Sequence, residues 1–179
     1  MSVARFNALT DHDARGLLLT CLDAPLWADR VVAGRPYETV GEVEAAMVAA
    51  SAAISDEELE QALARHPRIG ERADADRHDA AHSTREQSGV DRDDADLARR
   101  LAEGNRAYEE RFGRVFIVRA AGRDGHDILE HLQQRLDNSD GLERAATIDQ
   151  LTEIAVLRMR EQLGEPMGET SGNPEEGVS

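Results

Sequence analysis

Residues 145–163 read AATIDQLTEIAVLRMREQL, and the spacing of their apolar side chains decides the fold class. If each residue advances about 100° around a helix axis, Ile148 lies at about 0°, Leu151 at about 300° and Ile154 at about 240°. Ala155, at about 340°, falls inside the same stripe. A stripe of this width is typical of a helix with one face buried against other elements. The stretch therefore predicts a long helix that faces a core.

One cation interrupts that stripe. The same arithmetic places Arg158 at about 280°, in the middle of the apolar face, and Arg160 at about 120°, on the solvated face. Burying an unpaired guanidinium costs several kcal/mol, so Arg158 requires either a buried carboxylate partner or an anionic ligand in a cavity. Arginine suits both roles, and the sequence leaves both open.

Helix-start signals recur along the rest of the chain. In each, a hydroxyl side chain that can accept a backbone N–H is followed three residues later by an acid that can reach back to the first residue. The four pairs are Thr10 and Asp13, Thr39 and Glu42, Ser55 and Glu58, and Ser83 and Glu86.

These signals, apolar periodicity and Gly or Pro stops predict a single-domain, all-α helical bundle of seven to eight helices over residues 1–163. Residues 115–118, VFIV, predict one short extended segment near 115–119, because β-branched and aromatic residues run consecutively there. A mostly loop region is expected from residue 66 to 89, and residues 164–179 should be a disordered tail. The predicted helices cover residues 15–22, 26–32, 40–54, 56–64, 97–112, 128–136 and 145–163.

Composition excludes several classes of function. With 21 Lys+Arg against 36 Asp+Glu the formal net charge is −15, which argues against a nucleic-acid-binding face. Every one of the cations is Arg, so no lysine Schiff base is available. The single cysteine, Cys21, excludes an intramolecular disulfide and a multi-thiolate zinc site. No apolar run approaches the roughly 18 residues of a membrane span, and no signal peptide is evident, so we expect a soluble, cytoplasmic protein without membrane partners.

His66 is the first candidate for chemistry. Because Pro67 disfavours the α conformation in the residue before it, the helix from Asp56 should end at about Arg65 and leave His66 at its carboxyl end. The helix dipole there favours the imidazolium, which suits a proton donor. Alternatively, His66 merely caps the helix.

Glu86 lies in Ser83-Thr84-Arg85-Glu86-Gln87 and is also open to two interpretations. It completes a capping box with Ser83 and needs no further role. However, Gly89 follows three residues later and interrupts any helix almost at its start.

His78 and His82 are four residues apart, with acidic residues nearby, a spacing that on a helix can hold a divalent metal. The pair lacks the Glu of an HExxH motif and lies in a region without helical periodicity, so a solvated loop is the simpler interpretation. We therefore predict no metal ligands.

Five stretches in fixed order resemble the family of 2-oxo-4-hydroxy-4-carboxy-5-ureidoimidazoline (OHCU) decarboxylases. They are HPRIGE (66–71), STREQSG (83–89), NRAYEERFG (105–113), VFIVRAAGR (115–123) and LTEIAVLRMR (151–160). The resemblance implies an all-helical, cofactor-free and usually homodimeric enzyme that converts the ureidoimidazoline carboxylate to (S)-allantoin, the last step of urate degradation.

The resemblance also implies roles for individual residues. His66 matches the catalytic proton donor, Glu86 the acidic group needed for activity, and Arg158, rather than Arg160, the buried arginine. The remaining predicted substrate-binding residues are Pro67, Ser83, Thr84, Arg85, Gln87, Ile117, Val118 and Arg119, the last three through their backbone.

Two other functions remain as alternatives. A metal-dependent hydrolase would use His78 and His82. A non-enzymatic helical interaction module would bind through its acidic surface, with His66 as a helix cap and Arg158 in a buried ion pair.

Overall fold

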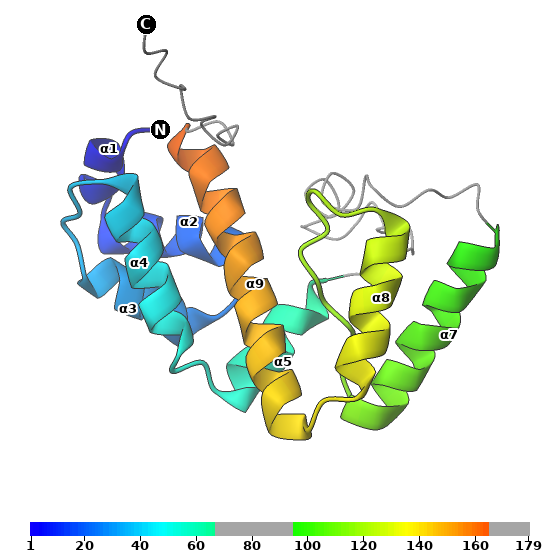
Figure 1. The fold of residues 1–179 in the computed structure, drawn as a ribbon. Coiled ribbons are helices and arrows are strands. Elements are labelled where there is room, and N and C mark those ends of the chain that lie inside the picture. Colours follow the sequence, from blue (N-terminus) through cyan, green and yellow to red (C-terminus); the bar gives the residue numbers. More distant parts are fainter. Residues whose placement is uncertain (67–94, 165–179) are drawn as a thin grey trace, which may run out of the picture.

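A 24-residue helix, α9 (Asp140–Leu163), stands at the centre of the fold, between the helices of the N-terminal half and two parallel helices that precede α9 in the chain (Figure 1). The structure is a computed structural model that describes residues 1–66 and 95–164. Along α9 the predicted stripe is buried, since Ile148, Leu151, Ile154 and Ala155 are each at most 8% exposed. The helical phase of residues 145–163 is therefore confirmed.

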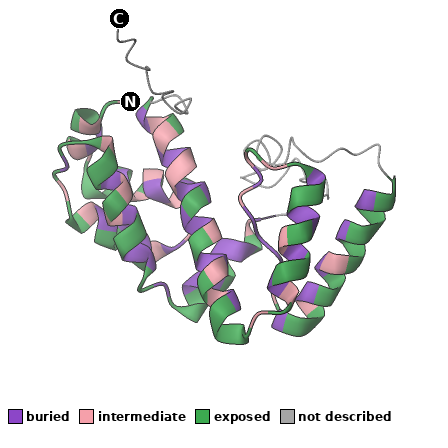
Figure 2. Ribbon diagram, viewed as in Figure 1, coloured by how far each residue is buried: buried purple, intermediate pink, exposed green. Residues whose placement is uncertain are grey.

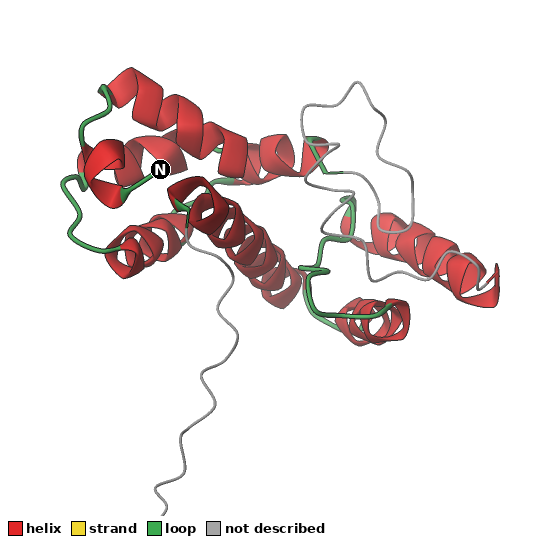
Figure 3. Cartoon of the chain, turned by 90° about the horizontal axis from the view of Figure 1, so that it is seen from above, coloured by secondary structure: helices red, strands yellow, loops and turns green. Residues whose placement is uncertain are grey.

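Seven further helices are described. They are α1 (Val3–Asn7), α2 (Asp11–Cys21), α3 (Pro25–Ala33), α4 (Val40–Ser51), α5 (Asp56–Ala64), α7 (Ala95–Phe112) and α8 (Gly125–Leu136). In the described residues all regular structure is helical (Figure 3), which confirms the predicted all-α single domain. No helix among residues 1–66 and 95–164 combines the length and apolar character needed to cross a bilayer. The predicted tail beyond Gly164 and the predicted loop beyond His66 lie outside the described residues.

Side-chain caps fix where the helices begin. Thr10, Thr39 and Ser55 each accept a hydrogen bond from the backbone N–H three residues on, as predicted. Asp124 caps α8 and Ser139 caps α9. α8 and α9 therefore begin at residues 125 and 140, a few residues before the predicted starts at 128 and 145.

The largest differences from the prediction are one additional helix and one earlier helix end. α1 was not expected, because five residues are too few to display a helical period, although its Phe6 is fully buried. The helix predicted to reach Ile54 ends at Ser51 instead. The Ile54 N–H bonds to the Ser51 carbonyl in a turn, at 3.2 Å, and this turn directs Ile54 into the core before Ser55 starts α5.

The buried side chains form two cores (Figure 2). The first core joins α1–α5 to α9, with Trp27 and Met47 among its fully buried members. The second core lies between α7 and α8 and includes Leu101 and Leu132. Gly104 permits the close approach of these two helices, because a Cβ there would lie 2.6 Å from Leu132 Cδ2.

The segment 115–120 divides its side chains between the two cores. Phe116, Val118 and Ala120 belong to the second core, whereas Ile117 belongs to the first. This alternation is typical of extended chain, in which successive side chains point in opposite directions. The short extended segment predicted near 115–119 is therefore confirmed. It lies between the two cores and is not part of a sheet in the described residues.

A buried network of hydrogen bonds holds this extended segment in place. Arg135 on α8 donates to the carboxylate of Glu143 on α9, with Nε at 2.8 Å from Oε1, and its Nη1 donates to the Ile117 carbonyl at 2.6 Å. Tyr108 on α7 donates its hydroxyl to Glu143, and Asn138 Nδ2 donates to the second carboxylate oxygen at 2.8 Å. Glu143 is fully buried, so these bonds replace the water that the charge has lost.

Burial raises the pKa of Tyr108 to about 12, and its hydrogen bond to the Glu143 carboxylate raises the pKa in the same direction. The phenol therefore stays protonated and keeps donating at neutral pH. The network thus joins α7, α8, α9 and the extended segment through buried hydrogen bonds.

Replacing Glu143 with Met should lower the free energy of unfolding by about 3–5 kcal/mol, because it leaves the Arg135 charge buried without its counterion. Urea denaturation followed by circular dichroism measures the loss. The control is Asp29→Asn, which removes the exposed ion pair with Arg15 and should cost less than about 1 kcal/mol. Equal stabilities of the two variants would contradict the role given to this pair.

Candidate active site

The first turn of α5 is held by a single buried carboxylate. Glu58 completes the capping box of its own helix with Ser55. Its Oε1 also accepts the backbone N–H groups of Leu26 at 2.7 Å and Trp27 at 3.1 Å, in the first turn of α3. One side chain therefore caps two helices and fixes α5 relative to α3, because each N-terminus presents unsatisfied donors and a partial positive charge.

The other end of α5 presents His66. The helix ends at Ala64 with Arg65 as its C-cap, as the His66-Pro67 dipeptide predicted. His66 is 6% exposed, and its Nδ1 lies 2.9 Å from the Ala62 carbonyl oxygen. A carbonyl only accepts, so Nδ1 carries the proton in this contact and Nε2 is the basic nitrogen of the neutral ring. The side chain therefore does cap the helix, and the same bond fixes its tautomer and orientation.

Arg158 lies on the inward face of α9, as its helical phase predicted. It is 3% exposed, and its Nη1 donates to the Cys21 carbonyl, 3.2 Å away at the end of α2. Arg160, one of the residues on the other side of α9, is half-buried and pairs with Glu44 of α4. The two arginines thus differ in surroundings in the way that the sequence indicated.

The extended segment contributes to the first core, which also contains side chains of α5 and α9. Ile117 shares that core with Leu63, near the end of α5, and with Ile154 and Met159 of α9. Its own carbonyl accepts from Arg135, and the Arg119 N–H donates to Gln150 Oε1 at 2.9 Å. The backbone donor of Arg119 is therefore engaged by the Gln150 side chain.

The other predicted site residues lie outside the described residues. These are Pro67, Ser83, Thr84, Arg85, Glu86 and Gln87, together with His78 and His82 of the alternative metal site. Within residues 1–66 and 95–164, no group of three or more His, Cys, Asp or Glu side chains is placed to hold a metal ion.

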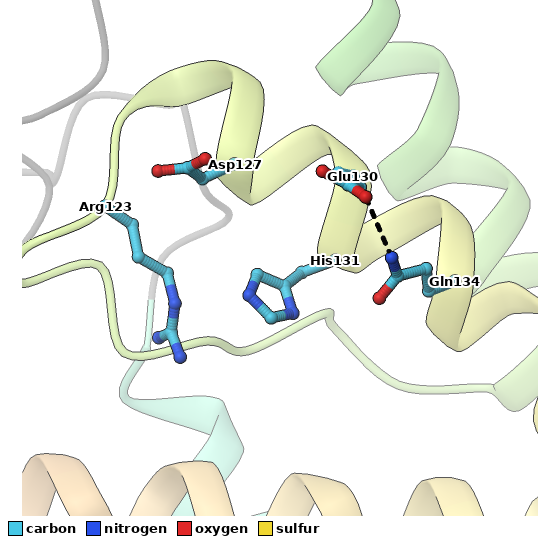
Figure 4. Close-up of a pocket in the computed structure, with 5 residues that line it drawn as sticks. All are labelled: Arg123, Asp127, Glu130, His131 and Gln134. Atoms are coloured by element: carbon cyan, nitrogen blue, oxygen red, sulfur yellow. Dashed lines mark hydrogen bonds between the residues drawn. The ribbon is translucent and has the colours of Figure 1, made fainter.

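A polar groove runs along α8 on the outer side of the segment. It holds a space of about 250 Å³ lined by Arg123, Asp127, Glu130, His131 and Gln134, and Gln134 donates to Glu130 at 3.0 Å (Figure 4). An adjoining space of about 190 Å³ reaches α9, and Val118 is the predicted site residue that lines it. Among the described residues, cations and carboxylates line the groove and neither His66 nor Arg158 does, while the adjoining space shares Val118 with the predicted site.

Three residues that hold the extended segment were missed in the sequence. Arg135 lies on the apolar face of α8, in helical register with Ile128 and Leu132, and Glu143 precedes Thr147 and Leu151 on the buried face of α9. The helical phase of Arg135 and Glu143 marks both as buried charges, as it does for Arg158. Gln150 carries no such signal, because it is half-buried and its partner is a backbone N–H.

Comparisons with known proteins agree on one family. The sequence model of the family described as OHCU decarboxylase matches residues 7–160. The 2-oxo-4-hydroxy-4-carboxy-5-ureidoimidazoline decarboxylase of Haloferax volcanii is 31% identical over 140 residues, covering 78% of this chain and 82% of the relative. The enzyme of the same name from Amia calva is 29% identical over 140 residues, covering 76% and 79%.

Solved structures agree in fold. A crystal structure of OHCU decarboxylase in the presence of (S)-allantoin superposes with a TM-score of 0.65 at 22% identity, over 87% of this chain and 99% of that one. A crystal structure of (S)-allantoin synthase gives a TM-score of 0.67 at 18% identity, over 91% of this chain and 54% of that one. Because the family model spans nearly all of the described residues and the Haloferax relative aligns over most of both chains, this chain belongs to the OHCU decarboxylase family.

Proposed function

We propose that this chain converts OHCU to (S)-allantoin and carbon dioxide, with His66 as the proton donor and Arg158 as the group that binds the anionic substrate. The observation that carries the proposal is the burial of an imidazole just beyond the end of α5 and of a guanidinium on α9, two helices whose side chains share one core with Ile117. Family membership supplies the reaction class.

The reaction requires a proton at a defined position. The bond between the ring carbon and the carboxylate breaks, carbon dioxide leaves, and the electron pair stays in the ring. One proton is then consumed at the ring carbon that becomes the stereocentre of allantoin. A donor held on one side of the ring produces a single enantiomer. His66 meets this requirement as the imidazolium, which donates its proton from Nε2 while the Nδ1 bond to Ala62 holds the ring in one orientation.

The substrate's charge gives Arg158 its role. A guanidinium binds a carboxylate through two parallel N–H donors and remains charged at all relevant pH values. The Cys21 carbonyl orients one end of this guanidinium. A local inward cation therefore allows a protein of net charge −15 to bind an anion, while the overall charge disfavours polyanions such as nucleic acid.

The backbone of Ile117 and Val118 is the part of the extended segment that we assign to the substrate, since the Arg119 N–H is bonded to Gln150. Fixed N–H donors stabilise negative charge that develops on an oxygen. By the resemblance, Glu86 accepts N–H groups of the substrate, and Pro67, Ser83, Thr84, Arg85 and Gln87 complete the binding residues. The proposal needs no metal or organic cofactor, and it includes the homodimer that the resemblance implies.

The purified chain tests the function directly. OHCU is generated in situ from urate, and the circular dichroism of allantoin is followed. We expect the (S) enantiomer to form faster than in the absence of the chain. A racemic product at the spontaneous rate would overturn the proposed function.

The variant His66→Gln should lower kcat by about 10²–10⁴, because it removes the general acid. The product should become racemic as the uncatalysed reaction takes over. The matched control is His12→Gln, an exposed histidine on α2, which should retain wild-type kinetics. Full stereoselective activity in His66→Gln would exclude the proton-donor role.

The variant Arg158→Lys should lower kcat/KM by about tenfold or more, chiefly through a higher KM, because lysine keeps the charge but loses two-point binding of a carboxylate. Arg160→Lys on the same helix should change kcat/KM by less than about twofold, since Arg160 pairs with Glu44 of α4 and lysine keeps the charge of that pair. Steady-state kinetics of both variants, with thermal unfolding as a control for folding, make the comparison. Equal KM values for the two variants would contradict substrate binding by Arg158.

A further inference from the structure

The extended segment 115–120 is held by side chains in place of a neighbouring strand. Arg135 Nη1 donates to the Ile117 carbonyl at 2.6 Å, and Gln150 Oε1 accepts the Arg119 N–H at 2.9 Å. The two bonds lie on either side of Val118. They come from different helices, so the backbone of this residue is fixed between α8 and α9.

The two anchors differ in rigidity. The guanidinium of Arg135 is buried and also bonds to Glu143 and to Thr147 Oγ1, at 3.1 Å, so it has little freedom to move. Gln150 is half-buried at the edge of the groove, and its Nε2 lies 3.4 Å from Glu153 Oε1. A change at Gln150 can therefore release one anchor without opening the core.

Gln150 also relates the segment to the proposed substrate cation. Arg158 lies eight residues further along α9, which is about 12 Å along the axis at 1.5 Å per residue. Since one rigid helix carries both side chains, the bond from Gln150 sets the position of the segment relative to Arg158. An ion pair between Arg119 Nε and Glu153 Oε2, which lie 3.1 Å apart, also links Arg119 to α9.

We propose that Gln150, together with Arg135, is a positioning residue that holds the Ile117 and Val118 backbone in the geometry required for decarboxylation. This inference rests on the proposed function. It assigns Gln150 no contact with the substrate. Its effect is to keep the N–H donors aligned as charge develops, and misplacement of such groups by a fraction of an ångström lowers the rate of the chemical step more than it weakens binding.

The test compares two substitutions of similar size. Gln150→Met removes the acceptor, whereas Gln150→Glu keeps one. Gln150→Met should lower kcat by roughly tenfold with KM changed by less than about twofold, and should reduce the enantiomeric excess of (S)-allantoin. Gln150→Glu should stay within about twofold of the wild type. The matched control is Gln134→Met on α8, whose amide bonds to Glu130, and it should have wild-type kinetics.

A second readout is independent of activity. Hydrogen exchange measured on the peptide covering residues 115–120 should be faster in Gln150→Met and unchanged in Gln150→Glu, with a thermal midpoint within about 2 °C of the wild type in both. Faster exchange with an unaltered kcat would overturn the positioning role, and so would unaltered exchange or an equal loss of rate in Gln150→Glu. Failure of the wild-type chain to accelerate the reaction would instead overturn the proposed function, and it would be seen before any variant is compared.

Discussion

The buried ion pair between Arg135 and Glu143 is the interaction on which the rest of the structure depends. It joins α8 to α9 beside the turn that connects them, and it reaches α7 through Tyr108 and the extended segment through the Ile117 carbonyl. A charge pair of this kind is costly to desolvate, so its value lies in the partners it fixes in place. Here the pair and its hydrogen bonds fix α7, α8, α9 and the extended segment, which together contribute to both cores.

Two buried arginines with the same chemistry have different surroundings. Arg135 faces a fully buried carboxylate, which neutralises it and makes it a structural cation. Arg158 donates to the Cys21 backbone carbonyl, which orients the guanidinium. The proposed substrate anion complements the second arrangement. Exposed pairs such as Arg15 with Asp29 contribute little by comparison, because water screens them.

The proposed site combines groups that are precise for different reasons. His66 is oriented by its own helix, whose other end Glu58 fixes against α3. The extended segment has no regular hydrogen-bonded structure of its own in the described residues, so its geometry depends on side chains from α8 and α9. Loss of one such side chain can therefore alter the site while the helices stay folded.

The sequence by itself determined the helices other than α1, the inward phase of Arg158, the position of His66 at a helix end and the extended segment near 115–119. Each of these follows from local periodicity, capping or the residue before a proline. Only the tertiary structure decided that Glu143 neutralises Arg135, that Glu58 caps a second helix and that Gln150 binds the Arg119 N–H. Helical phase marks Arg135 and Glu143 as buried, but their pairing and the partner of Gln150 depend on how separate helices pack, which no spacing along one chain records.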